Sequence, residues 1–201
     1  MLIATLTFGW IGIGIFLLIV FSLRSLLKNN EYGFLHMLMA VMYSMWLPLP
    51  FFLTEILTYE ALRIGMIFGL LYLIMMVVTM AMQTGHIVHI AREEKTASAH
   101  EERSNHIMAT LCGPFELLAN IFKCIWAFFL VLAFWDNDMK MFAGVMLIFV
   151  MFIFYFLILL VNNSLNKPLK LFEKVVSNPY VFNIETICFF LTIIIYITVQ
   201  Q

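Results

Sequence analysis

Charged residues are scarce in this chain of 201 residues. Asp, Glu, Lys and Arg make up 11% of the sequence, whereas they make up about a quarter of a soluble globular domain. Hydrophobic residues make up 64%, and the mean hydropathy is +1.01. The 11 basic and 12 acidic residues nearly balance, so the chain lacks the positive charge that nucleic-acid binding requires. These shortages argue against a soluble domain and a nucleic-acid partner, and they favour a protein whose solvent is mostly lipid.

Cysteines and catalytic motifs are also scarce. Cys112, Cys124 and Cys188 lie in apolar runs without a paired motif, so we expect buried, unreactive thiols rather than a disulfide framework or a zinc knuckle. The chain contains no GxSxG motif, Walker loop or HExxH helix. Its first apolar run lacks the basic segment of a secretory signal, so we expect it to remain as a spanning helix. The sequence does not indicate an enzyme, and nothing in it requires a cofactor.

Long apolar runs are abundant. A helix needs about 20 apolar residues to cross the hydrocarbon core of a bilayer, and six runs reach this length. No change in composition marks a separate soluble domain. We therefore predict an all-α fold, in which a single polytopic membrane domain forms a bundle of about six helices. The predicted helices cover residues 2–23, 34–57, 64–90, 107–135, 139–161 and 181–199.

Basic residues are concentrated in alternate connections between these helices. The first, third and fifth connections together contain eight lysines and arginines, whereas the second and fourth contain only Arg63 and Lys140. The positive-inside rule then predicts a cell-membrane protein with both termini outside. Trp10, Trp46 and Trp135 would lie in the outer half or at the outer interface, where tryptophan often anchors helices.

The fifth connection has an amphipathic pattern of its own. A helix over residues 168–177 would place Leu169 and Phe172 on one side. Lys170 and Lys174 would lie near the other side. Such a helix would lie in the headgroup region and direct its lysines toward anionic lipid. Each lysine would contribute about 1 kcal/mol to membrane binding. The alternative is a plain solvated loop.

Pro48 and Pro50 lie in the outer half of the predicted helix 34–57. Each proline removes an amide donor and crowds the carbonyl group four residues earlier, here those of Ser44 and Trp46. We therefore expect this helix to kink or unwind at the prolines.

Three polar residues interrupt the apolar run at 107–135. Glu116, Asn120 and Lys123 are separated by four and three residues, so they share one face of a helix. Lys123 lies near the middle of the run, where an unpaired lysine costs about 2.5–3.5 kcal/mol. Asn120 or a water molecule could connect Lys123 to Glu116. Glu185 on the last helix enters from the same side and is the other candidate partner.

Four histidines fall near the predicted cytoplasmic ends of the helices. Neutral imidazole binds zinc and first-row metals, and two facing imidazoles can ligate a haem iron. A polar helix end that emerges into water explains the same pattern without a ligand. The candidate metal or haem ligands are His36, His86, His89 and His106.

These residues lead to three functional hypotheses. The first is a small transporter or channel-like protein for an ion or small solute, with a polar cavity that faces the cytoplasm. Its site residues would be Lys123, Glu116, Asn120 and Glu185, which could instead form a network that only holds helices together. The second is a metal- or haem-binding membrane protein that uses the histidines. The third is an accessory subunit that packs against another membrane protein, and we also consider a homo-oligomer.

Overall fold

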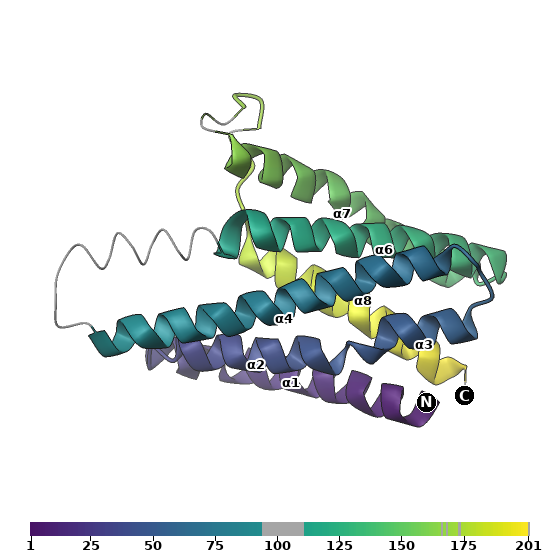
Figure 1. The fold of residues 1–201 in the computed structure, drawn as a ribbon, viewed down its shortest axis with the longest axis horizontal. Helices are drawn as coiled ribbons and strands as arrows, with labels where there is room; N and C mark the ends of the chain where they lie inside the picture. Colours follow the sequence, from purple (N-terminus) through teal and green to yellow (C-terminus); the bar gives the residue numbers. More distant parts are fainter. Residues whose placement is uncertain (94–110, 166, 168, 173, 201) are drawn as a thin grey trace.

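The computed structural model describes residues 1–93, 111–165, 167, 169–172 and 174–200. Six helical segments in this part of the chain are long and apolar enough to cross a membrane. The chain is therefore a multi-pass helical membrane protein, which confirms the predicted fold class (Figure 1). The elements are α1 (Leu2–Lys28), α2 (Tyr32–Met45), α3 (Pro48–Ile56), α4 (Leu62–Glu93), the π-helical turn η1 (Leu111–Phe115), α6 (Glu116–Asp136), α7 (Lys140–Ser164) and α8 (Pro179–Val199).

The spanning helices form a ring in sequence order. Helices α1 and α2, α2 and α4, α4 and α6, and α6 and α7 pack side by side. Helix α8 completes the ring because it contacts both α7 and α1. Both termini lie at the same end of the bundle, as an even number of crossings requires (Figure 1).

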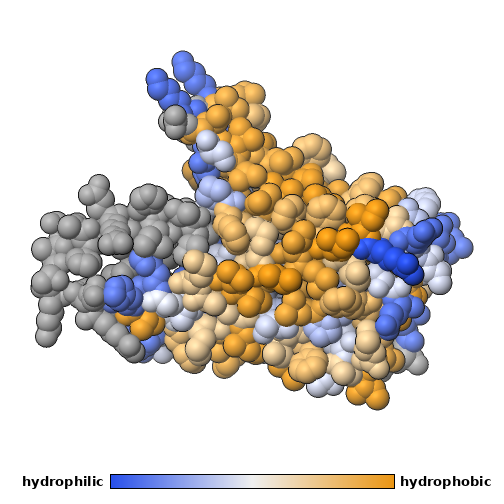
Figure 2. Space-filling model, in the orientation of Figure 1, coloured by the Kyte–Doolittle hydropathy of each residue, from blue (hydrophilic) through white to orange (hydrophobic). Residues whose placement is uncertain are grey.

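Large aromatic side chains fill the inside of this ring. The ring of Trp46 stacks on Phe190, with 4.0 Å between the ring centroids. Trp126 packs edge-on against Phe189 at 5.2 Å. All four side chains are fully buried. On the outside, hydrophobic residues cover the middle of the face seen in Figure 2, and hydrophilic groups gather at its ends, as contact with lipid requires.

The proline pair breaks the second spanning segment between α2 and α3, as predicted. The carbonyl group of Ser44 accepts a hydrogen bond from the amide of Leu47 at 3.3 Å. The carbonyl group of Trp46 accepts one from the amide of Leu49 at 3.0 Å. Tight turns of the chain itself therefore satisfy the carbonyls that Pro48 and Pro50 leave without their usual helical donors.

The expected role of Trp46 as an interfacial anchor is wrong. Trp46 is 0% exposed, whereas Trp10 and Trp135 are 44% and 62% exposed. The indole Nε1–H of Trp46 donates to the carbonyl oxygen of Gly9 in α1 at 3.2 Å. This internal acceptor removes the need for an indole to reach the interface.

Gly12 provides the space for Trp46. A Cβ atom on Gly12 would lie 2.3 Å from Nε1 of Trp46. We expect Gly12→Ala to lower the free energy of unfolding by about 1–3 kcal/mol, because the indole must shift in a packed core. Gly14→Ala is the matched control, since a Cβ there meets nothing within 4 Å. Thermal unfolding in detergent would measure both, and equal midpoints for the two variants would contradict the prediction.

Helix α6 starts after a break at Gly113. The backbone angles of Gly113 are not helical, at φ −96° and ψ −107°. Pro114 explains the break because proline disfavours the helical region for the residue before it. The first residues of the predicted helix 107–135 lie outside the part of the chain that the structure describes.

Two further predictions from the sequence differ from the structure, one for the fifth connection and one for a cysteine. Within 168–177, the described residues form turns rather than the expected interfacial helix, with the amide of Phe172 bonded to Leu169 and that of Val175 to Phe172. A helix this short gains little stability without packing. Cys124 is buried as expected, but Cys188 is exposed on the outer face of α8.

Candidate functional site

The centre of the candidate site is an ion pair between α6 and α8. Lys123 is 0% exposed and Glu185 is 4% exposed. The ammonium group of Lys123 pairs with Oε2 of Glu185 and also donates to the hydroxyl of Thr186 at 2.9 Å. The Thr186 hydroxyl in turn donates to Oε2 of Glu185 at 3.4 Å. Glu116 and Glu185 were the two carboxylates considered as partners of Lys123. The structure pairs Lys123 with Glu185, which is farther from it in the sequence.

Aromatic rings enclose the ammonium group. Nζ of Lys123 lies 5.2 Å from the ring centroid of Tyr72 in α4 and 5.6 Å from that of Phe156 in α7. Both distances suit an attraction between a cation and an aromatic face, which strengthens where water is excluded. Tyr43 of α2 packs edge-on against Tyr72 at 6.0 Å. Side chains from α2, α4, α6, α7 and α8 therefore meet around one charge.

The pair is enclosed but incompletely hydrogen-bonded. Oε1 of Glu185 has no hydrogen-bond partner among the described residues. A buried carboxylate gains most when all its lone pairs are satisfied, and desolvation opposes the ion pair otherwise. The complete burial of Lys123 also means that the expected cytoplasm-facing cavity does not reach it in this conformation.

Glu116 and Asn120 form a separate polar layer nearer the start of α6. Nε2 of Gln83 in α4 donates to Oε1 of Glu116 at 2.7 Å. Nδ2 of Asn120 donates to the backbone carbonyl of Glu116 at 2.9 Å. Asn120 therefore does not connect Glu116 to Lys123, as had been considered. Glu116 lies seven residues before Lys123, or about 10 Å along the helix axis. The polar residues on this face of α6 therefore have different partners: Glu116 bonds to Gln83, and Lys123 bonds to Glu185 and Thr186.

The four histidines predicted as metal ligands lie on different parts of the chain, and the structure describes three of them. His36 donates from Nδ1 to the carbonyl oxygen of Tyr32 in its own helix at 2.7 Å. His86 and His89 lie in the last turns of α4, and His106 lies outside the described residues. Within the described ranges, no group of three or more His, Cys, Asp or Glu side chains is placed to hold a metal ion. The metal or haem hypothesis therefore stays a prediction, since His106 lies outside the described residues.

Several site residues carried no signal in the sequence. Tyr72 and Phe156 lie in apolar runs, where an aromatic residue normally indicates core packing. Thr186 directly follows Glu185, but a single threonine in a spanning helix usually bonds to its own backbone. Gln83 lies near the end of the predicted helix 64–90, where a polar side chain normally indicates a helix end that emerges into water.

Comparisons of this chain with protein-family models, curated proteins and solved structures found no match. The enclosed ion pair is therefore the feature of this chain from which a function can be inferred.

Proposed function

We propose that this protein is a small transporter or channel-like protein for an ion or small solute, with the Lys123–Glu185 pair on its path. The observation that supports this most is the position of the pair inside the ring of helices, with Lys123 near the middle of the spanning segment Gly113–Asp136 and both side chains buried. Ionisable residues within spanning helices are costly, and they often mark ion paths and proton relays. Apolar residues can often replace a pair that only holds helices together.

In this proposal the present conformation is the closed one. An anionic group that reached Lys123 would replace the Glu185 carboxylate as its counter-ion. A proton that bound to Glu185 would weaken the pair in the same way. Glu116 and Asn120 lie on the route from the pair to the end of the bundle where α6 begins, and Glu116 would exchange protons there. The distribution of basic residues favours the cytoplasm for that end, with the termini outside.

The packing of α8 supports a path that can open. Its backbone lies close to α1 and α7, while it meets α6 mainly through long side chains, including the ion pair itself. A small shift of α8 against α6 would separate the two charges without breaking close backbone contacts. Sliding or rocking of packed helices is a common way to open a site within a membrane.

Flux measurements on a double variant test the proposal. Proteoliposomes loaded with pH-sensitive or chloride-sensitive dyes would report proton movement and the entry of chloride, acetate or phosphate. We expect the parent protein to exceed empty liposomes for at least one of these probes. Lys123→Met/Glu185→Met removes both charges together, so it should fold and yet reduce this flux to background. Lys140→Met is the matched control because that lysine is exposed at the end of the bundle.

Two results would contradict this function. One is a parent protein that moves none of these probes faster than empty liposomes. The other is a double variant that is as active as the parent, because the charges would then be unnecessary. A double variant with a normal thermal transition and no flux would separate a functional pair from a packing contact.

A further inference from the structure

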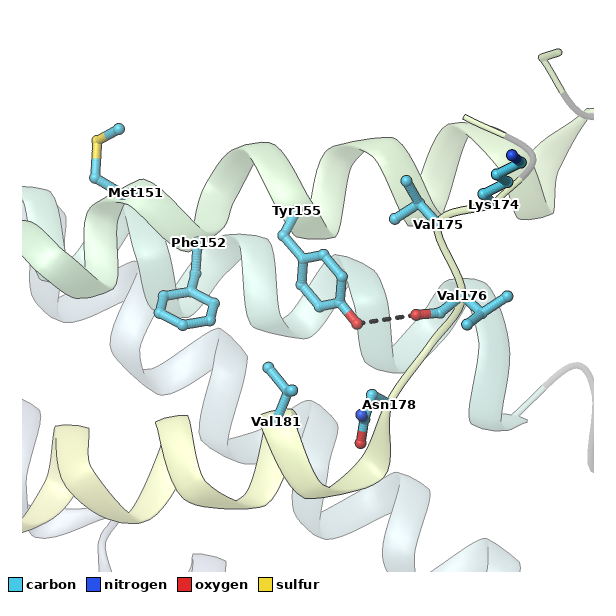
Figure 3. A pocket seen from close by; sticks show the side chains of 8 residues that line it. All are labelled: Met151, Phe152, Tyr155, Lys174, Val175, Val176, Asn178 and Val181. Carbon is cyan, nitrogen blue, oxygen red and sulfur yellow. Dashed lines mark hydrogen bonds between the residues drawn. The ribbon is translucent and has the colours of Figure 1, made fainter. Parts of the chain in front are cut away.

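A groove lies between α7 and the start of α8, where the chain segment 174–178 crosses from one helix to the other (Figure 3). Its volume is about 570 Å³. The hydroxyl of Tyr155 in α7 donates to the carbonyl oxygen of Val176 at 3.1 Å and so fixes this segment beside α7. Phe152 of α7 and Val181 of α8 face each other across the groove (Figure 3). This hydrogen bond holds one wall of the open groove beside α7.

The two ends of the groove differ in chemistry. Met151 and Phe152 line one end with apolar surface, and Lys174 lies at the other end (Figure 3). Asn178, which also lines the groove, accepts a hydrogen bond from the amide of Tyr180 and so caps α8. An occupant must therefore have a hydrocarbon part and an anionic or hydrogen-bonding end.

The groove opens where lipid is the natural occupant. Helix α7 is the least buried of the six spanning segments, because only 22% of its most apolar 18-residue stretch is buried. Lys174 precedes α8 by a few residues and lies at the same end of the bundle as the start of α6. Residues 165–178 contain three lysines and one glutamate, and such a basic segment attracts the negative surface of a membrane.

We propose that this groove binds an anionic phospholipid, with one acyl chain along Met151 and Phe152 and its phosphate at Lys174. The lysine supplies the charge that a zwitterionic lipid would satisfy less well. The apolar wall supplies a place for the chain that a free phosphate ion would not use. The bound lipid would fill the space between α7 and the start of α8, and it would do so independently of the ion pair.

Lipid retention by purified protein tests this proposal. The protein, exchanged into detergent with phosphatidylglycerol or phosphatidylcholine, would be analysed by native mass spectrometry. A lysine near the surface contributes about 1 kcal/mol to anionic lipid binding, so we expect phosphatidylglycerol to bind about fivefold more tightly. Lys174→Gln should abolish this preference. Lys170→Gln is the control, because Lys170 lies in the same connection but does not line the groove.

A second variant tests the apolar part of the groove. Met151→Trp should fill the space beside Phe152 and lower the retention of both lipids. Met141→Trp is its control, since Met141 is exposed on the same helix and lies outside the groove. Equal binding of the two lipids by the parent would overturn the proposal. Equal effects of Lys174→Gln and Lys170→Gln would also overturn it, because they would indicate diffuse attraction to the whole connection.

Discussion

Lys123→Met should lower the free energy of unfolding by about 3–5 kcal/mol. The substitution leaves the buried Glu185 carboxylate without the ammonium group that neutralises it, and a single buried charge is costly. It also leaves Thr186 without its donor at 2.9 Å. Titration of the detergent-solubilised protein with a denaturing detergent, followed by tryptophan fluorescence, would measure the loss.

Two comparisons make this prediction specific. Lys140→Met removes a lysine whose side chain is 67% exposed and lies 3.8 Å from Asp138. An exposed pair of this kind contributes about 0–1 kcal/mol, so this variant should stay close to the parent. Lys123→Met/Glu185→Met should recover most of the stability, because no charge is then buried. If Lys123→Met and Lys140→Met had the same free energy of unfolding, the ion pair would not hold α6 and α8 together.

Trp46→Ala should be comparably destabilising, at about 3–5 kcal/mol. This residue joins three helices, since its ring stacks on Phe190 of α8 and its Nε1–H donates to Gly9 of α1. Its ring also packs edge-on against Tyr43 at 5.8 Å. Truncation would leave a large cavity at the centre of the ring of helices. The same denaturant titration, followed by circular dichroism because a tryptophan is lost, would measure the effect.

Trp135→Ala is the matched control for this prediction. Trp135 is 62% exposed at the end of α6, so its truncation should have a much smaller effect. Trp46→Phe should fall between the two, because phenylalanine keeps the stacking on Phe190 but loses the hydrogen bond to Gly9. If Trp46→Ala and Trp135→Ala unfolded at the same denaturant concentration, Trp46 would not be part of the core.

The candidate site was only partly predictable. The cost of a lysine at mid-membrane required a partner, and Glu185 was one of the two carboxylates considered for that role. The expected link through Asn120 was wrong, because Asn120 bonds to the backbone of Glu116 instead. Side-chain direction on one helix narrows the search to one half of the membrane, but it does not specify which neighbouring helix approaches. Gln83 and Tyr72 became site residues only because α4 packs beside α6.

The features that followed from sequence alone are local. A run of about 20 apolar residues suffices to specify a spanning helix, since every backbone group is satisfied within it. Proline acts on its own helix, so the break at Pro48 also follows from neighbours in the chain.

The tertiary structure decided which side of each helix faces inward. Helices that are apolar on all sides give no periodic signal that separates the lipid face from the core. For that reason the inward position of Trp46, the exposure of Cys188 and the aromatic enclosure of Lys123 could not be read from spacing. These features depend on contacts between helices that are distant in the sequence, and they arise only when the ring closes through α8.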